Sequence, residues 1–364
     1  MSPEVRVDQV SARAFRIPTD APESDGTLEW NSTTLIVVQA SGGRKTGIGY
    51  TYASRAAAVV ICDTLAPVVC KCDCLDVPGA WRAMIASVRN IGWRGVCANA
   101  ISAVDWALWD LKAKLVDLPL TALLGRNADS VEIYGSGGFT SYEDVHLAKQ
   151  LSGWIERDGC RAVKMKVGRC PSRDPARVRC ARAAIGEAQL YVDANGALSR
   201  KQALDCARTF AEDRVVWFEE PVSSDDLSGL RLVRDRAPDG MEVAAGEYGY
   251  ERFYFRRMLE AGAVDVLQAD ATRCCGLTGF LEAAALAEAF STPLSAHTAP
   301  ALHVHAGCAV VNFRNVEWFH DHVRIEAMLF DGAPKPSQGR IAPDLSRPGL
   351  GLAFKERDAE RFAV

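Results

Sequence analysis

Between residues 162 and 319, a polar residue stands at or next to the end of each of seven short apolar runs. The runs recur at intervals of about 20 to 28 residues, roughly the length of one strand followed by one helix. In barrels built from such units, catalytic groups lie at the carboxyl ends of the strands. The series therefore predicts a shared active site formed by Lys166, Asp193, Glu219, Glu247, Asp270, His297 and Glu317.

The apolar runs have the composition of strands that are buried on both faces. They are short and often β-branched, as in residues 215–219, and segments of helical period lie between them, as in 199–212 and 278–290. This alternation predicts an α/β fold of parallel strands closed into a barrel. Any single strand-end acid could equally be a helix cap or a solvated loop residue, but seven in phase favour function.

Three of the acids predict a metal site. Asp193, Glu219 and Glu247 end successive strands, and carboxylates with no His or Cys among them favour Mg²⁺ over zinc. Asn195 lies two residues after the first ligand and is expected to help orient the site. Glu220 is expected beside the site or at the surface.

Two further groups have the pattern of proton-transfer residues. Lys164 and Lys166 are two apart on one strand, so their side chains point the same way, and mutual repulsion is expected to lower a lysine pKa. Asp270 would fix the tautomer of His297 on the opposite side of the barrel. Glu317, if kept protonated, would donate a hydrogen bond to a substrate oxygen.

Jointly, these motifs resemble the enolase superfamily, mandelate racemase subgroup (the mandelate racemase/muconate lactonizing enzyme family). The matching segments are Val163-Lys164-Met165-Lys166, Val192-Asp193-Ala194-Asn195-Gly196, Phe218-Glu219-Glu220-Pro221, Gly246-Glu247, Asp270, Ser295-Ala296-His297 and Glu317. Residues 100–125 also resemble the last helix of the family's capping domain. The resemblance spans essentially the whole chain.

The resemblance implies a modified TIM barrel, (β/α)7β, with an N-terminal α+β capping domain. The expected domains are a cap with specificity loops at 1–125, the catalytic barrel at 126–325, and a C-terminal segment at 326–364 that returns to the cap. It further implies a homo-oligomer, by analogy a dimer or octamer.

The resemblance also supplies roles for the strand-end residues. The three acids would bind Mg²⁺. Lys166 and the His297/Asp270 dyad would be bases on opposite faces of a small carboxylate substrate, and Lys164 with Glu317 would hold its carboxylate. The shared step is removal of the proton α to that carboxylate.

Two departures from the family pattern stand near the sixth strand. The chain has Arg273-Cys274-Cys275-Gly276 where relatives usually carry a Gly-Gly pair, so the Cys275 side chain is expected to crowd or alter the loop beside Asp270. The branch containing cycloisomerases and dipeptide epimerases places a catalytic lysine in this region. No lysine is present there, which disfavours that branch.

Composition excludes other classes of function. A net charge of −4 over 364 residues gives no basic surface for nucleic acid. Neither the N-terminus nor any internal run has the apolar length of a signal or membrane segment, so a cytoplasmic protein is expected. The 12 cysteines are scattered along the chain and are expected to be free thiols.

Substrate specificity is expected to come from cap loops that close over the barrel. The predicted lid is a loop from Ile17 to Trp30, and a second loop carries Tyr50 to Tyr52. Trp30, Tyr52, Tyr248 and Asn195 are the candidate substrate contacts. His320 and His322 are expected in a mostly exposed loop after the last strand, where one of them could touch substrate.

Three functions are compatible with this sequence. The first is Mg²⁺-dependent dehydration of a sugar acid, an aldonate or aldarate, to a 2-keto-3-deoxy acid, favoured by the polar lid. The second is racemisation or epimerisation of a 2-hydroxy acid, as in mandelate racemase, because two bases on opposite faces can relay one proton. The third is a non-catalytic barrel used as a binding module, disfavoured by the complete set of acids and bases.

Overall fold

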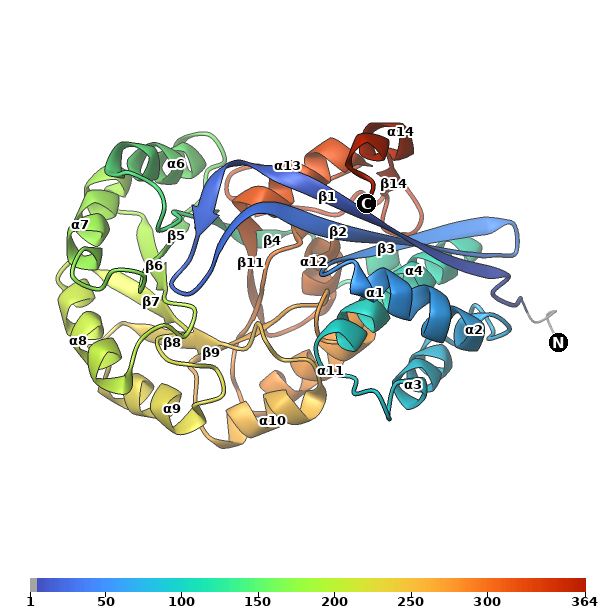
Figure 1. Cartoon of the computed structure of the whole chain (residues 1–364), viewed down its shortest axis with the longest axis horizontal. Helices are drawn as coiled ribbons and strands as arrows, with labels where there is room; N and C mark the ends of the chain where they lie inside the picture. Colours follow the sequence, from blue (N-terminus) through green and yellow to red (C-terminus); the bar gives the residue numbers. More distant parts are fainter. Residues whose placement is uncertain (1–4) are drawn as a thin grey trace.

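A ring of parallel strands surrounded by helices, with an α+β cap at one end, makes up the chain (Figure 1). The structure is a computed structural model that describes residues 5–364. The first four residues of the predicted 1–125 domain, and of the N-terminus expected to lack a signal segment, lie outside the described residues. Within residues 5–364, no helix combines the length and apolar character that a membrane crossing requires.

The barrel is closed by eight parallel strands, because the last strand pairs with the first. The strands are β4 (Val131–Gly137), β5 (Ala162–Lys166), β6 (Gln189–Asp193), β7 (Val215–Glu219), β8 (Glu242–Ala245), β9 (Val266–Ala269), β10 (Leu294–Ala296) and β11 (Phe313–Phe319). The helices are α6 (Asp144–Glu156), α7 (Asp174–Ile185), α8 (Arg200–Ala211), α9 (Leu227–Arg236), α10 (Arg252–Glu260), α11 (Gly276–Ala289), α12 (Pro300–Ala309) and α13 (His320–Leu329). The predicted modified TIM barrel is confirmed.

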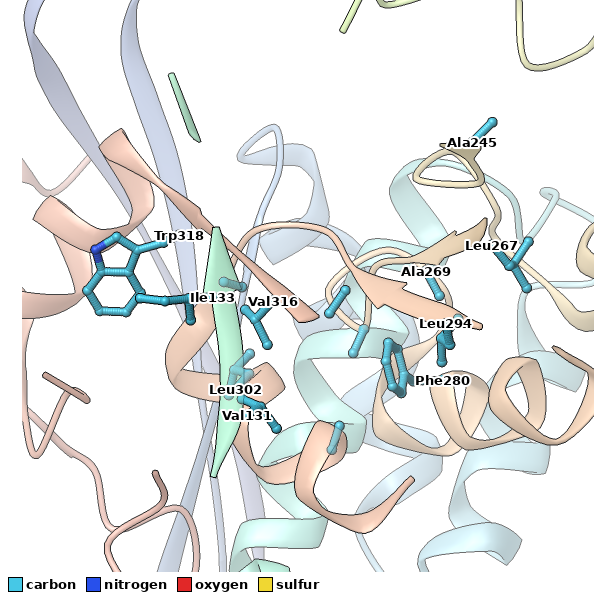
Figure 2. Packing of buried hydrophobic residues seen from close by; sticks show 14 of the residues in the cluster. Val131, Ile133, Ala245, Leu267, Ala269, Phe280, Leu294, Leu302, Val316 and Trp318 are labelled. Carbon is cyan, nitrogen blue, oxygen red and sulfur yellow. The ribbon is translucent and has the colours of Figure 1, made fainter. Parts of the chain in front are cut away.

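Apolar side chains fill the space between strands and helices. Phe280 of α11 lies beside Leu294 of β10, and Leu267 of β9 belongs to the same cluster (Figure 2). Inside the barrel a second cluster closes the lower end, where Tyr191 stacks on Trp217 with ring centroids 4.9 Å apart. Because side chains alternate along a strand, the polar residues two positions later, Asp193 and Glu219, point into the same interior above this apolar layer.

The cap consists of a three-stranded antiparallel sheet packed on helices. Its elements are β1 (Gln9–Ser24), β2 (Glu29–Gly42), β3 (Lys45–Tyr52), α1 (Ala56–Val60), a π-helical turn (Ile61–Leu65), α2 (Ala66–Val69), α3 (Val77–Ser87), α4 (Val96–Leu115) and α5 (Leu120–Leu124). The remaining elements are β12 (Phe330–Asp331), β13 (Arg340–Ile341), β14 (Ala353–Phe354), α14 (Glu356–Ala359) and a 3₁₀ turn (Glu360–Phe362). The last residues return to the cap, since the Val364 amide donates to the Ala14 carbonyl.

Both predicted cap loops are wrong, because each is part of a strand. Strands β1 and β2 continue as a long hairpin that extends over the barrel, and only Asp25 to Leu28 form its turn (Figure 1). One Asp25 oxygen accepts hydrogen bonds from the Thr27 and Leu28 amides, which fixes this turn. The Tyr50–Tyr52 segment lies within β3. Tyr50 is fully buried, so this segment contributes to the cap–barrel contact and forms no loop.

Helix α13 joins the barrel to the cap through hydrogen bonds. Asp321 accepts from Thr33 of the hairpin, Arg324 donates to the Pro18 carbonyl at 2.7 Å, and Tyr50 donates to Glu326 at 2.6 Å. These bonds cross between segments roughly 300 residues apart in sequence. The hairpin position therefore depends on α13.

The loop between β9 and α11 also contacts the cap, and here one expectation is corrected. Cys275 adopts a left-handed backbone conformation, with φ of 65°, yet its buried side chain packs into the apolar cluster of the cap. Its carbonyl accepts a hydrogen bond from Trp81. The thiol therefore does not disturb the Asp270 side of the barrel. The described residues include all 12 cysteines, and each is a free thiol, as predicted.

Burial shifts the titration of acids along the contact between cap and barrel. Burial raises the pKa of Glu326 from 4.5 to about 8, and burial raises that of Asp105 to about 7. Both are in hydrogen bonds that join the two parts of the molecule. Since each folded-state pKa lies above the unfolded value, the protonated acid stabilises the fold.

The Glu326→Gln variant tests this coupling. The contribution of Glu326 is complete below about pH 4.5 and is lost as the pH rises through about 8, so the wild-type melting temperature should fall across this interval relative to the variant. Thermal unfolding between pH 5 and 9 measures the difference. Glu260→Gln, an exposed control on α10, should parallel wild type. A Glu326→Gln profile that also parallels wild type would contradict the assignment.

Candidate active site

Two lysines of β5 lie among carboxylates at the carboxyl end of the barrel. Lys164 donates to Glu219 and lies 2.9 Å from Glu317, while Lys166 donates to Asp193 at 2.5 Å. Lys164 is fully buried and Lys166 nearly so. The two-residue spacing that placed both lysines on one face of the strand therefore places both in the same buried cluster.

The expected lowering of a lysine pKa is wrong, although the charge of Lys164 does act to lower the pKa of Lys166. Burial opposes protonation, but the carboxylate of Asp193 raises the pKa of Lys166, and those of Glu219 and Glu317 raise the pKa of Lys164. Attraction to acids at 2.5 to 2.9 Å outweighs repulsion between the two ammonium groups. Both lysines are therefore protonated while they are paired with these acids.

The acids of three successive strand ends converge. Asp193, Glu219 and Glu247 each offer one carboxylate oxygen, and these atoms lie within 4.8 Å of one another. All three residues are buried. Buried side-chain oxygens of Glu247 and Asn195 have no hydrogen-bond partner among the described residues. The arrangement thus offers hard oxygen donors around one point, and one of the three acids, Glu247, keeps a buried oxygen without a hydrogen bond.

Glu220, which follows the second of these acids, is not at the surface. It is 1% exposed, and burial together with the charge of Glu247 raises its pKa well above the usual range. A neutral carboxylic acid beside the three acids adds no further negative charge.

His297 faces the lysines from β10. Its Nδ1 lies 2.8 Å from an oxygen of Asp270, and its Nε2 lies 3.3 Å from Glu247. The other Asp270 oxygen accepts from the amide and hydroxyl of Thr272, both at 2.7 Å. Burial opposes ionisation of Asp270, but the hydrogen bond and charge of His297 hold its pKa below the usual range. An ionised Asp270 that accepts from Nδ1–H leaves Nε2 free to exchange a proton.

Arg273 is not among the predicted site residues, yet it connects the metal-type acid Glu247 with Asp270, the partner of His297. Its guanidinium lies 3.1 Å from Glu247 and 3.5 Å from Asp270, above the ring of Tyr248. In the sequence, the position of Arg273 beside the Cys pair indicates only a departure of this loop from the family pattern.

Glu317 does not have the protonation state expected from sequence. Burial alone would raise its pKa, but Lys164 and His297 hold the pKa well below the usual range, and Ser136 donates to it at 2.6 Å. It is therefore an ionised acceptor and cannot donate a hydrogen bond to a substrate oxygen. The backbone amide of Thr298 occupies its second oxygen.

A cavity of about 250 Å³ lies between these groups and the cap hairpin. Lys166 and His297 both line it, as do the predicted contacts Asn195, Trp30 and Tyr248. Tyr52 does not line it, because its ring is stacked behind His322, with centroids 3.4 Å apart.

His322, expected in an exposed loop, is buried in α13 and lines the cavity. His320 pairs with Asp20 instead, at 3.0 Å. The sequence signal for this helix is the Asp321-x-x-Arg324 pattern, since these two side chains bond to each other and Asp321 also accepts from the cap. Because α13 begins directly after β11, the segment resembles a loop in the sequence.

Comparison with known proteins agrees with this geometry. Residues 9–125 match the family model for the N-terminal domain of mandelate racemase/muconate lactonizing enzymes, and residues 146–359 match the enolase C-terminal domain-like model. A mandelate racemase/muconate lactonizing enzyme-like protein from Rubrobacter xylanophilus is 50% identical, with a TM-score of 0.96 over 99% of this chain and all of that one.

Two curated relatives are enzymes of sugar acids. The chain is 31% identical to 3,6-anhydro-α-L-galactonate cycloisomerase of Streptomyces coelicolor, over 98% of this chain and 99% of the relative. It is 30% identical to L-talarate/galactarate dehydratase of Salmonella typhimurium, over 97% and 90%. A structure of that dehydratase holds Mg and L-lyxarohydroxamate; its TM-score is 0.90 at 27% identity, over 100% of this chain and 94% of that one.

One relative is thus a cycloisomerase, a class that the missing sixth-strand lysine had disfavoured. Both halves of the chain match the family models, and the relatives align along nearly its full length. The chain belongs to the mandelate racemase/muconate lactonizing enzyme family of the enolase superfamily.

Proposed function

We propose that the protein is a Mg²⁺-dependent lyase that dehydrates a sugar acid to a 2-keto-3-deoxy acid. The observation that carries the proposal is that Lys166 and His297 reach one cavity from β5 and β10, beside three converging carboxylates. Two proton-transfer groups and a cluster of metal-type ligands around one small cavity suit removal of a proton α to a carboxylate.

Asp193, Glu219 and Glu247 would hold the Mg²⁺. Their oxygens fit a hard cation, and the unpartnered Glu247 oxygen is a polar atom whose burial a ligand would compensate. When bound, the ion supplies positive charge that stabilises the developing enediolate. Carboxylate oxygens engaged by the ion would also weaken the pairing that keeps Lys166 protonated.

The chain's own residues would carry the proton transfers. Lys166 or His297, which both line the cavity, removes the proton from C2 of the acid. Lys164 is fully buried and does not line the cavity, so it would stabilise the substrate carboxylate through its charge and not by direct contact. His297, fixed by Asp270, then donates a proton to the departing C3 hydroxyl, which leaves as water. The resulting enol tautomerises to the 2-keto-3-deoxy acid.

A cycloisomerase reaction is the second candidate, and the Streptomyces relative favours it. In a 3,6-anhydro sugar acid the oxygen on C3 belongs to a ring, so the same removal of the C2 proton and loss of the C3 oxygen opens the ring without releasing water. Racemisation at C2 would use the same two bases and no leaving group.

A panel of acid sugars, including a 3,6-anhydro acid, tests the proposal. With Mg²⁺, at least one member should give a 2-keto acid that semicarbazide traps, and EDTA should abolish the activity. Asp193→Asn and Glu247→Gln should each weaken Mg²⁺ binding in calorimetry by more than about 100-fold, because each removes a charged ligand. Asp205→Asn, on the exposed face of α8, is the control. No turnover on any member, or unchanged binding in both variants, would refute the proposal.

The two bases can be separated by hydrogen exchange at C2. Lys166→Ala and His297→Asn should each lower kcat by about 10²–10⁴-fold. In D₂O each variant should still exchange the C2 hydrogen of one configuration, and the two variants should act on opposite configurations. NMR measures the exchange, with Lys201→Ala as the exposed control. Exchange of the same configuration by both variants would place the bases on one face and contradict the assignment.

A further inference from the structure

We propose that the cap-side half of the cavity is a hydroxyl-binding subsite that lacks a cation and has His322 as its hydrogen-bond donor, so that the substrate is a monocarboxylic sugar acid and not a dicarboxylic one. This inference rests on the proposed function and narrows its substrate class. It concerns the end of the substrate away from the carbon that loses its proton.

The charges that line the cavity are unevenly placed. The barrel side contributes both cations, Lys166 and Arg273. Each is already paired, Lys166 with Asp193 and Arg273 with Glu247 and Asp270. These pairs belong to the reacting end of the cavity.

The cap side of the cavity offers no cation. Its lining residues are Asp25, Leu28, Trp30, Ser32 and Thr33, all from the β1–β2 hairpin or its turn. A second carboxylate placed here would meet the acid of Asp25 and would lose its water without gaining a partner charge. A primary hydroxyl at the same position carries no such penalty.

His322, which lines the same cavity, is held as a neutral donor. Its Nδ1 accepts a hydrogen bond from the Ala299 amide at 3.3 Å, which places the ring proton on Nε2. Stacking on Tyr52 and an edge contact with Phe319 fix the ring plane. Burial and the charge of nearby His297 hold the pKa of His322 well below 6.5, so the ring is neutral at physiological pH.

The Nε2–H group of His322 has no hydrogen-bond partner within residues 5–364, although the residue lines the cavity. Opposite acceptors come from the hairpin: the Thr33 hydroxyl proton is donated to Asp321, which leaves the Thr33 oxygen free to accept. A sugar hydroxyl both donates and accepts, so it complements this pair. A carboxylate only accepts and would leave the Thr33 oxygen unsatisfied.

Matched substrates test the charge preference. Each six-carbon aldonate is compared with the aldarate of the same configuration, since the two differ only at C6. For the configuration that is turned over, kcat/KM should be at least about 100-fold higher for the aldonate. Equal or better turnover of the aldarate would overturn this inference while leaving the dehydratase proposal intact. No turnover of either, by an enzyme that binds Mg²⁺, would overturn both.

The Asp25→Asn variant isolates the charge on the cap side. The amide oxygen can still accept from the Thr27 and Leu28 amides, so the turn is retained while the charge is removed. The aldarate-to-aldonate ratio of kcat/KM should rise at least 10-fold. An unchanged ratio would contradict the subsite.

The His322→Phe variant isolates the donor. Phenylalanine keeps the stacking on Tyr52 but cannot donate, so KM for the aldonate should rise at least 10-fold with a smaller change in kcat, and His322→Gln should recover part of the loss. His146→Phe is the matched control, because His146 is also stacked on a tyrosine, Tyr142, but lies exposed on α6. Melting temperatures verify that each variant is folded. An unchanged KM in His322→Phe would exclude the donor role.

Discussion

Attraction between two lysines and a group of acids, all buried at the mouth of the barrel, is the interaction on which the site depends. Lys164 and Lys166 are buried against Asp193, Glu219 and Glu317. The charges of the lysines lower the pKa of Asp193 and of Glu317 against the effect of burial, whereas burial raises the pKa of Glu219. Loss of one partner of a buried pair typically costs about 3–5 kcal/mol. The barrel supplies a rigid frame for this arrangement, because the side chains project from the ends of neighbouring strands. The aromatic layer of Tyr191 and Trp217 closes the barrel interior below them.

The cap forms a boundary of this charged centre. Its hairpin lines the cavity, and α13 connects the last barrel strand to the hairpin through Asp321 and Arg324 and to β3 through Glu326. The same helix places His322 in the cavity. A single helix thus carries both the residues that bond to the hairpin and a residue that lines the cavity.

Sequence reasoning reached the strands and their terminal residues because two simple periods encode them. Alternation along β5 and the regular spacing of strand ends place Lys166, Asp193 and His297 in one interior.

The cap could not be predicted in the same way, because Ile17–Trp30 is rich in polar residues and resembles a loop. Pairing with β2 and the hydrogen bond from Trp30 to Glu23 make it a strand, and these contacts are not local in sequence.

The predicted protonation states of the lysines and of Glu317 are wrong, because these states depend on distances of 2.5 to 2.9 Å between side chains on different strands. His322 was placed in a loop because its burial comes from packing against Tyr52.

A crystal structure with Mg²⁺ and an unreactive hydroxamate of a sugar acid tests the central claim most directly. The account predicts one ion held by Asp193, Glu219 and Glu247, with the carbon next to the hydroxamate lying between Lys166 Nζ and His297 Nε2. An ion bound away from those three acids, or a ligand that presents only one face to both nitrogen atoms, would contradict it.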